Sequence, residues 1–518
     1  MKVVTVLEMR EIEQAADNAG ISYKSMLENA GNNLGEWIHT NFGKSDAHVV
    51  MGLIGSGNNG GDTLVALTYL AKRGWLSIAY LVKPRRLDDP YLAALVEAGG
   101  KQVASTQDQS GAFLSGVIRH AGIILDGILG TGFKPPLEDD LRKTLGKIPQ
   151  VIADNAVKPV IIAVDCPSGV DCVDGEVDKA ALPTDYTACM AAVKSGLLKF
   201  PAFAYCGELV SLPIGLPEDF PLLTSKAVEI IEHQAARKYL PIRPKDGHKG
   251  TFGTCLILAG SRSYPGAAFL AGKAAYLSGT GLVEMIGDEC LRLQLAGRFP
   301  EAIWAEYPGN DAQIEELITT KSRTTTAILV GPGIGRSDHA SMLVNSIIQA
   351  IASKYPDQPL IIDADGLRII KTIERWWEKM PDQTILTPHP GEMAVLTGLS
   401  VAEVQSDRVA IASYHAKLWQ KTIILKGAVT IIAGPNGYCT IIPIASPALA
   451  TAGTGDVLAG LVTGFCAQGV KSTEAAILAA YIHASAGQLA EKQYGQSFTA
   501  TATDVLDHIP PVLAQLKQ

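Results

Sequence analysis

The feature that most constrains this chain is an alternation, repeated from end to end, of short apolar runs and longer segments with helical spacing. The short runs are rich in Val and Ile and carry few charges, as strands buried on both faces do. This alternation is typical of parallel sheets whose strands are joined by helices packed on the sheet faces. The sequence therefore predicts an α/β protein.

The same patterns give approximate bounds to the expected elements. In the first half, residues 7 to 40 are expected to form helices laid on the sheet, and strands are expected at about 47 to 54, 77 to 82, 122 to 128 and 159 to 165. In the second half, strands are expected near 252 to 259, 326 to 331, 359 to 363, 384 to 387 and 421 to 433. Helices are expected there at 266 to 280, 339 to 355, 401 to 420, 456 to 468 and 472 to 492.

The length of the chain requires more than one core. Single α/β domains run to about 250 residues, so 518 residues suit two large domains better than three. A proline-rich stretch from Leu212 to Pro244 separates the halves, and such stretches suit connections between domains. We place the boundary within 215 to 245 and take the domains as 1–220 and 221–518.

Composition excludes several classes of protein. Apolar residues make up 47% of the chain and charged residues 19%, which excludes a disordered chain. The net charge is -8 and no Lys/Arg-rich run is present, so nucleic acid is not an expected partner. No uncharged run is long and apolar enough to predict a membrane span.

Cysteine usage and the first ten residues indicate a compartment. The eight cysteines include no Cys-X-X-Cys pair, and several lie in apolar, strand-like runs, so we expect reduced core thiols. Lys2, Glu8 and Arg10 leave no room for the apolar core of a signal peptide. Both observations favour the cytoplasm.

A glycine-rich loop, Gly55-Ser-Gly-Asn-Asn-Gly-Gly-Asp62, lies between an expected strand and an expected helix. Amides at the start of a helix attract anions, so the loop would suit a phosphate group. A tight turn with Asp62 as a helix cap explains the same residues about equally well, although the density of Asn and Gly favours a ligand. The loop has neither the Walker spacing nor that of the dinucleotide fingerprint.

Two more expected strands in the first half end at polar residues. One is followed by Asp126-Gly-Ile-Leu-Gly130-Thr131-Gly132, and the other by Asp165-Cys-Pro-Ser168-Gly. Ligands bind at the carboxyl ends of parallel strands, so these loops could converge on one crevice, and their oxygens would suit a hard cation. A single aspartate at such a place is more often a cap or turn residue than a catalyst.

In the second half, a glycine turn at Gly453-Thr-Gly455 leads into an apolar helix with Asp456 in its first turn. Such a carboxylate could accept a hydroxyl proton while the helix amides hold the charge of a transferred phosphoryl group. Taken alone, Asp456 is as easily explained as a helix-start residue favoured by the dipole.

Other strand ends in the second half carry polar groups that strengthen the case for a site. His389 stands between two prolines, on a rigid and extended backbone that suits a site residue better than a helix-core histidine. The remaining segments are Gly331-Pro-Gly-Ile-Gly335, Asp363-Ala-Asp365 and Lys426-Gly-Ala-Val-Thr430.

Together these motifs resemble the bifunctional NAD(P)H-hydrate repair enzymes, in which an NAD(P)HX epimerase domain precedes an ADP-dependent NAD(P)HX dehydratase domain. In the first half the resemblance rests on residues 57–62, 126–132 and 165–169. In the second half it rests on residues 248–253, 264–268, 331–333, 387–392, 426–427 and 453–456. The resemblance implies a Rossmann-like domain followed by a ribokinase-like domain.

For the epimerase, the resemblance implies two sets of site residues. The potassium ligands would be Asn59, Asp126 and Ser168. The hydrated nucleotide would contact Asn58, Asn59, Gly60, Gly61, Asp62, Gly130, Thr131, Gly132, Phe133, Lys134, Pro135, Pro136 and Asp165. We choose Asp165 as the acid/base group because burial at a strand end can raise a carboxyl pKa.

For the dehydratase, the resemblance implies that NADHX or NADPHX contacts Ala267, Gly333, His389 and Asp456. The adenine nucleotide, ADP or ATP with Mg²⁺, would contact Lys426, Gly427, Ala428, Val429, Thr430 and Gly455. Asp456 is expected to be the base that lets the substrate hydroxyl attack the terminal phosphate. We also expect a homo-oligomer.

One departure from the family pattern and two alternatives remain. The family usually has Gly after the Asn-Asn-Gly-Gly-Asp run, whereas this chain has Thr63, whose side chain is expected to narrow the loop. The second domain could instead be a kinase for a vitamin or sugar hydroxyl. The first domain could instead be a nucleotide sensor without catalysis.

Overall fold

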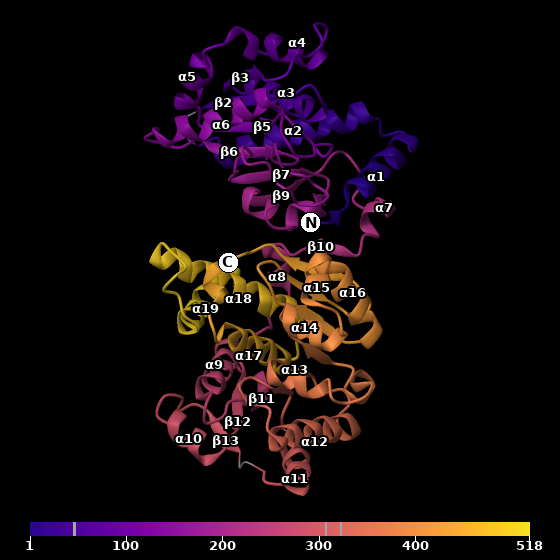
Figure 1. Ribbon diagram of the computed structural model, residues 1–518, viewed down its shortest axis with the longest axis vertical. Coiled ribbons are helices and arrows are strands. Elements are labelled where there is room, and N and C mark those ends of the chain that lie inside the picture. Colours follow the sequence, from indigo (N-terminus) through magenta and orange to yellow (C-terminus); the bar gives the residue numbers. More distant parts are fainter. Residues whose placement is uncertain (45–47, 306–307, 322–323, 518) are drawn as a thin grey trace. The chain divides into compact units, whose positions relative to one another are not determined.

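The computed structural model describes residues 1–44, 48–305, 308–321 and 324–517 (Figure 1). Within these residues the chain divides into two compact units, Met1–Lys226 and Ala227–Gln518. Each unit has a large sheet of its own. The first residue of the strand expected at 47 to 54 lies outside the described residues.

The first unit is built on a seven-stranded sheet in which every neighbouring pair of strands is parallel. In spatial order the strands are β4 (Lys101–Ala104), β3 (Leu76–Leu81), β2 (Val49–Ile54), β5 (Ile123–Gly127), β6 (Val160–Val164), β7 (Tyr186–Met190) and β9 (Glu208–Leu212). A separate two-stranded parallel sheet pairs β1 (Val3–Val4) with β8 (Val193–Lys194).

Helices cover both faces of this sheet. Successive strand residues point to opposite faces, and in β2 both sets of side chains are apolar and buried. Val50 and Ile54 of β2 belong to one core, together with residues of α1 (Val6–Asn18), α2 (Tyr23–Phe42), α3 (Asn58–Ala71) and α4 (Pro90–Glu97). Met51 and Leu53 belong to a second core, with α5 (Ala112–His120) and α6 (Asp139–Ala153). A short helix, α7, spans Pro221–Thr224.

The order of the strands fixes where a ligand can enter the first unit. From β2 the chain proceeds outward through β3 and β4, and then returns to β5 on the other side of β2. Connections that leave in opposite directions open a crevice at the carboxyl ends of the two central strands. The glycine loop follows β2, and Asp126 lies in β5, so both expected motifs lie at this point.

The second unit contains a ten-stranded sheet that is mostly parallel, with antiparallel pairs only at β17–β18 and β18–β19. In spatial order its strands are β10 (Val228–Ile230), β19 (Cys439–Ile442), β18 (Thr430–Ala433), β17 (Thr422–Leu425), β16 (Thr384–Leu386), β15 (Leu360–Ile362), β14 (Ala327–Val330), β11 (Thr254–Leu258), β12 (Leu282–Ile286) and β13 (Ile303–Ala305). The strand order reverses between β14 and β11.

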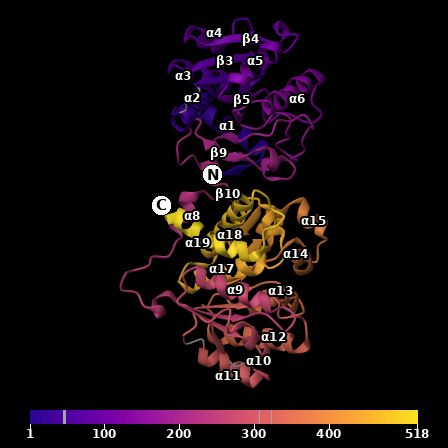
Figure 2. The same ribbon diagram turned by 90° about the vertical axis from the view of Figure 1, so that its left-hand side faces the viewer.

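One core of this unit joins the sheet to a group of helices, visible in Figure 2: α8 (His233–Lys238), α9 (Pro265–Leu277), α10 (Glu289–Leu295), α17 (Thr454–Ala467), α18 (Ser472–Tyr494) and α19 (Ala502–Lys517). Helices α9 and α17 approach closely, since a Cβ at Gly460 would lie 2.1 Å from the carbonyl oxygen of Ala271. The other helices are α11 (Asp311–Lys321), α12 (Asp338–Lys354), α13 (Asp365–Ile370), α14 (Pro390–Thr397), α15 (Val401–Ser406) and α16 (Arg408–Trp419).

The α/β prediction is confirmed, but two expected elements are wrong. The run at 421 to 433 is a hairpin of β17 and β18 rather than one strand, because residues 426–429 form the turn between them. The helix expected at 401 to 420 is broken at Asp407, which leaves the helical region with a φ of -148°.

Several strands were not expected from the sequence: β1, β4, β7, β8, β9, β10, β12, β13 and β19. Strands β10 and β13 are three residues long, which is too short to show the hydrophobic periodicity of a strand. In β12 the apolar run is interrupted by Glu284, which is buried and pairs with Lys321 from α11. Only the fold supplies such a partner for a buried charge.

All eight cysteines are free thiols, as expected, and seven of them are buried, with Cys290 partly exposed. None of the described helices combines the length and hydropathy that a membrane span requires.

Because each unit has its own sheet and core, we expect a cut between Lys226 and Ala227 to give two fragments that each unfold cooperatively in urea. The position of the cut matters, because Lys226 pairs with Glu8 in the first unit and β10 pairs with β19 in the second. A cut after Lys238 should therefore lower the urea midpoint of the second fragment by exposing the edge of β19. Equal midpoints for the two cuts would contradict this expectation.

Candidate active sites

In the first unit, a buried arginine supports the glycine loop that follows β2. The guanidinium group of Arg85 donates hydrogen bonds to the carbonyl oxygens of Gly55 and Gly57, at 2.7 and 3.0 Å. Gly55 cannot carry a side chain, because its Cβ would lie 1.8 Å from the carbonyl oxygen of Ile128. Helix α3 then begins at Asn58 with no side chain capping its amides. The loop is thus rigid, and the start of the helix is open.

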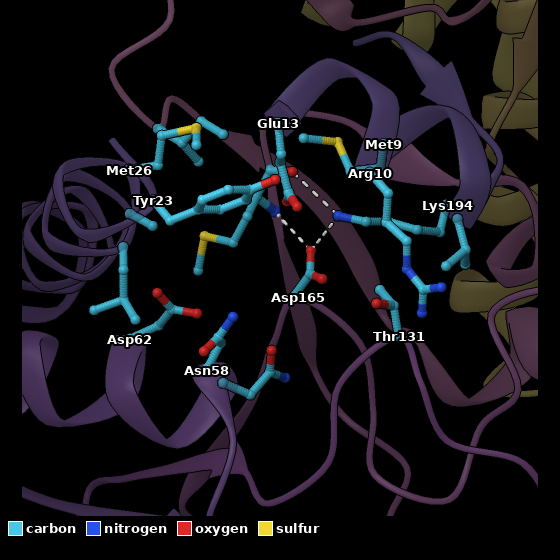
Figure 3. Close-up of a pocket in the computed structure, with 16 residues that line it drawn as sticks. Met9, Arg10, Glu13, Tyr23, Met26, Asn58, Asp62, Thr131, Asp165 and Lys194 are labelled. Carbon is cyan, nitrogen blue, oxygen red and sulfur yellow. Dashed lines mark hydrogen bonds and ion pairs between the residues drawn. The ribbon is translucent and has the colours of Figure 1, made fainter. Parts of the chain in front are cut away.

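A cavity of about 290 Å³ lies beside this helix start (Figure 3). Its walls come from α1, α2, α3, the loop after β5, the end of β6 and β8. The charged and polar side chains that line it are Arg10, Glu13, Tyr23, Asn58, Asn59, Asp62, Thr131, Asp165 and Lys194. A polar cavity at the carboxyl ends of the central strands is where an α/β sheet binds small molecules.

Asp165 and Lys194 form a buried ion pair in the wall of this cavity. Lys194 is 1% exposed, and its ammonium group also donates to the carbonyl oxygens of Met190 and Ala192, both at 3.1 Å. Burial alone would lower the pKa of Lys194, but the Asp165 carboxylate outweighs burial and raises it. Asp165 has a φ of +64°, an uncommon backbone conformation for a residue other than glycine.

Two further carboxyl groups share the cavity. Burial, followed by the negative charge of Asp165, raises the pKa of Asp62 well above its usual value. Burial also raises the pKa of Glu13, on α1. The cavity therefore holds one carboxylate with a buried cation beside it and two whose ionisation burial disfavours.

The expected potassium ligands lie close together at the cavity wall, where Asn59 and Ser168 both contact the backbone of Leu129. Asp126 is fully buried and accepts hydrogen bonds from the amide and the hydroxyl of Ser168, at 2.7 and 2.6 Å. The Nδ2 atom of Asn59 donates to the carbonyl oxygens of Leu129 and Val164, and its Oδ1 atom faces Gly130. The donor set consists of oxygen atoms with a single carboxylate, which suits a hard cation of low charge.

Thr63 does not enter the cavity. Its side chain is fully buried against the sheet, where its hydroxyl donates to the carbonyl oxygen of Asn59 at 2.7 Å. Glycines make room for it, since a Cβ at Gly127 would lie 1.9 Å from the Thr63 hydroxyl and one at Gly52 would lie 2.8 Å from its methyl group. Thr63 therefore packs beneath the loop rather than narrowing the cavity.

A second hollow of about 220 Å³ adjoins the first. It shares Val6, Arg10 and Thr131 with the first cavity. Its other lining residues are Leu7, Gly132, Phe133, Lys134 and Val173. Of the residues that the resemblance implies, Gly60, Gly61, Gly130, Pro135 and Pro136 line neither hollow.

In the second unit, neighbouring strand ends assemble another buried pair. Lys426, after β17, donates to Asp363, after β15, at 2.8 Å, and the Asp363 carboxylate also accepts from the hydroxyl of Thr387. Burial opposes the charge of Lys426, but Asp363 and Glu392 outweigh it and raise its pKa. The fold thus fixes a cation at the carboxyl edge of this sheet.

Asp456 lies in the first turn of α17, next to this cation. A Cβ at Gly455 would lie 3.4 Å from the Lys426 ammonium group, which places the start of α17 against Lys426. Burial, followed by the charge of Asp363, raises the pKa of Asp456 to about 7, although Lys426 acts in the opposite direction. A carboxyl group with this pKa can accept a proton near neutral pH.

A buried histidine supports the same helix start. His483, on α18, lies with its Nε2 atom 2.8 Å from the carbonyl oxygen of Thr454. Burial lowers the pKa of His483 to about 4, so the ring is neutral at pH 7 and donates this hydrogen bond from Nε2.

His389 caps α14. Its Nδ1 atom accepts hydrogen bonds from the amides of Gly391 and Glu392, at 3.0 and 3.3 Å. The ring is half exposed, and burial followed by the charge of Lys426 lowers its pKa. The accepting Nδ1 leaves the ring proton on Nε2, the atom that lies 3.4 Å from the Glu392 carboxylate.

The turn between β17 and β18 is held by a second arginine. Arg408 donates to the carbonyl oxygens of Leu425, Lys426 and Val429, at 3.0, 3.1 and 2.8 Å. Gly427 is required beside it, because a Cβ there would lie 2.4 Å from the guanidinium group. Residues 427 and 428 are exposed, whereas the Val429 side chain is buried.

Ala267 and Gly333 meet where the strand order reverses. A Cβ at Gly333 would lie 2.7 Å from that of Ala267, in the first turn of α9. Gly333 has a φ of +63°, in the left-handed region that favours glycine. The loops after β11 and β14 therefore approach each other at the reversal point.

Comparisons with known proteins match both units. Residues 23–196 match a family model described as YjeF-related protein N-terminus, and residues 255–511 match one described as NAD(P)H-hydrate dehydratase. A bifunctional NAD(P)H-hydrate repair enzyme from Moorella thermoacetica is 32% identical, covering 100% of this chain and 98% of its own. One from Thermofilum pendens is 31% identical, covering 100% and 97%.

The chain belongs to the family of bifunctional NAD(P)H-hydrate repair enzymes. The resemblance carried by the motifs is thereby confirmed. A solved ribokinase-like superfamily protein from Enterococcus faecalis V583 is 25% identical with a TM-score of 0.50, covering 57% of this chain and 98% of its own. The ribokinase-like fold expected for the second half agrees with this similarity.

Several residues of this repair enzyme's sites were not found from its sequence. Lys194 is a lone lysine in an apolar run. Such a lysine indicates a buried partner, but the sequence does not identify that partner. Glu13 and Tyr23 were assigned only to helices covering the sheet. Arg85 and Arg408 contact backbone carbonyl groups, for which no sequence pattern exists.

The Asp165–Lys194 pair leads to a prediction about stability in this repair enzyme. Lys194→Met leaves the Asp165 carboxylate buried without a cation, and breaking a buried pair in this way costs about 3–5 kcal/mol. We expect a loss of that size in urea unfolding of the first unit. The double variant Lys194→Met/Asp165→Asn should recover part of it, because no charge is then buried alone. A single variant destabilised by less than about 1 kcal/mol would contradict the prediction.

Proposed function

We propose that this protein repairs hydrated NADH and NADPH in two steps carried out by its two domains. The first domain, residues 1–220, interconverts the R and S epimers of NAD(P)HX. The second, residues 221–518, dehydrates the S epimer with an adenine nucleotide as phosphoryl donor. Family membership supports this pair of activities over a vitamin or sugar kinase.

The observation that carries the proposal is Asp456, whose pKa burial raises to about 7 beside the Lys426 cation. The substrate carries a hydroxyl on a ring carbon next to nitrogen, and hydroxide is a poor leaving group. Asp456 accepts the hydroxyl proton as the oxygen attacks the terminal phosphorus of the nucleotide. The ring nitrogen then expels phosphate, and loss of a proton from the neighbouring ring carbon restores NAD(P)H.

The residues around Asp456 have distinct parts in this proposal. Lys426 and the amides at the start of α17 stabilise the negative charge of the transferred phosphoryl group. The substrate contacts Ala267, Gly333, His389 and Asp456, and the nucleotide contacts Gly455 and the turn at Lys426, Gly427, Ala428, Val429 and Thr430. Arg408 and His483 hold these two segments in place.

Magnesium fits this site as part of the nucleotide. The described residues include no cluster of three or more acidic, His or Cys side chains that could hold a metal alone. Mg²⁺ on nucleotides is commonly held by phosphate oxygens and water with one or two carboxylates, so the phosphates can hold it while Asp456 remains the proton acceptor. The chemistry of the ion there would be to neutralise phosphate charge.

The epimerase proposal places NAD(P)HX in the first unit's cavity. The substrate contacts residues 58–62 and 130–136, and Asp165 exchanges protons with it, while Lys194 holds the Asp165 carboxylate in place. Potassium would be held by Asn59, Asp126 and Ser168, whose oxygen donors suit it, and would order the loop after β5. A homo-oligomer and a cytoplasmic location stay predictions.

The dehydratase proposal is tested at Asp456. We expect Asp456→Asn to lower kcat for S-NADHX by about 10²–10⁴-fold, because it removes the proton acceptor but keeps the shape of the side chain. Recovery of reduced-nicotinamide absorbance measures the rate. Asp357→Asn, an exposed position in the same unit, should leave it unchanged. A stable phosphorylated product would instead support the kinase alternative.

The raised pKa of Asp456 leads to a second prediction, about how stability and kcat depend on pH. The folded-state pKa of about 7 exceeds the usual value of 3.8, so ionising this group opposes folding. Asp456 should therefore reduce stability progressively as pH rises from about 4 to about 7, and the wild-type kcat should rise over the upper part of this range as the base ionises. In Asp456→Asn the second unit should be more stable than wild type at pH 7.5. A variant that is less stable, with an unchanged kcat–pH profile, would reject this role.

The epimerase proposal is tested in the first unit with the full chain. We expect Asp126→Ala and Asp165→Asn each to slow the conversion of R-NADHX while leaving dehydration of S-NADHX intact, because the second unit is unchanged. Added K⁺ should accelerate wild-type epimerisation more than that of Asp126→Ala. Wild-type epimerisation in both variants would remove these roles.

A further inference from the structure

Asp62 is a buried carboxyl group that has no partner within the described parts of the chain. Its residue is 7% exposed, and its side chain lines the cavity of the first unit. No hydrogen bond or ion pair to its carboxyl oxygens occurs among the described residues, and burial and nearby charges are what act on it. Figure 3 shows Asp62 separated across the cavity from Asp165 and Lys194.

Asp165 is the opposite case in the same cavity. One of its carboxylate oxygens accepts from both the amide of Met190, at 2.9 Å, and the Lys194 ammonium group. Hydrogen bonds and a cation favour the ionised form of a carboxyl group, whereas burial without them favours the protonated form. Two carboxyl groups that face one cavity thus have contrasting surroundings, one with donors and a cation and the other without.

Burial and the negative charges nearest Asp62 act on its pKa in the same sense. From α1, Glu13 faces the cavity with Arg10, and Tyr23 comes from α2. Burial and the charges of Asp165 and Glu13 raise the pKa of Asp62, whereas Lys194 opposes them. Lys194 is already engaged by Asp165 and two carbonyl oxygens. These surroundings therefore favour the protonated form of the Asp62 carboxyl group.

We propose that Asp62 is the general acid of the epimerase reaction and that Asp165, held by Lys194, is its general base. This inference rests on the proposed epimerase function and assigns the roles within it. Enzymes commonly separate acid and base in this way, by placing two carboxyl groups in contrasting environments.

The proton and electron movements balance without any other reactant. Asp62 gives its proton to the substrate hydroxyl, the carbon–oxygen bond breaks, and water leaves as the ring-nitrogen lone pair forms a carbon–nitrogen double bond. The Asp165 carboxylate stabilises the resulting cation. Water then adds to the opposite face of the same carbon and gives a proton to Asp165. Transfer of that proton to Asp62 through water restores both groups.

The test is the pH dependence of R-NADHX conversion to the S epimer by the full chain without nucleotide, followed by separating the two epimers. Because the acid must be protonated, the wild-type rate should fall on the alkaline side. Asp62→Asn should lower the rate by about 10²–10⁴-fold and abolish this alkaline decrease. Asp62→Glu should restore part of both. Asp154→Asn, exposed at the end of α6, is the matched control and should behave as wild type.

Each contrary result has a defined meaning. Wild-type R-NADHX that is consumed no faster than without enzyme would overturn the epimerase function and, with it, this assignment. An active wild type whose rate shows no alkaline decrease, or an Asp62→Asn variant within threefold of wild type, would overturn the Asp62 role alone. If Glu13→Gln rather than Asp62→Asn removes the alkaline decrease, Glu13 is the acid. If a variant does not fold, the rate–pH profile of the wild type still tests the Asp62 role, because a missing alkaline decrease overturns it.

Discussion

Both candidate sites depend on a buried lysine–aspartate ion pair at the carboxyl ends of parallel strands: Lys194 with Asp165 in the first unit, and Lys426 with Asp363 in the second. In each site the lysine ammonium group is thus bound to one aspartate carboxylate. A second carboxyl group remains in each site, Asp62 across the cavity from its pair and the partly buried Asp456 near the other, and burial raises its pKa. One arrangement therefore prepares both sites for proton transfer, although the reactions differ.

The loops at these sites are held by arginines through backbone carbonyl groups. Arg85 contacts the loop after β2, and Arg408 contacts the turn after β17. An arginine can satisfy several carbonyl oxygens at once because its donors are fixed in a plane. The carbonyl groups thus turn toward the guanidinium, and the loops remain rigid without regular secondary structure.

Packing explains how the chain tolerates its departure from the family pattern. Thr63 stands where the resemblance leads us to expect glycine, and its side chain turns toward the sheet and fills the space beside Gly52 and Gly127. The cavity wall is then formed by Asn58, Asn59 and Asp62. A sequence comparison alone places Thr63 in the motif and gives no direction for its side chain.

The sequence by itself determined the α/β class, most strand positions and the motifs at strand ends, because these depend on local periodicity and on residues that are close in the chain. It also singled out Asp165 and Asp456. Only the tertiary structure decided which carboxyl groups have partners. Lys194 lies 29 positions from Asp165, and Lys426 lies 63 positions from Asp363. Parallel strands bring such distant residues to one edge of a sheet, and the pKa of a buried group depends on that neighbourhood rather than on its place in the sequence.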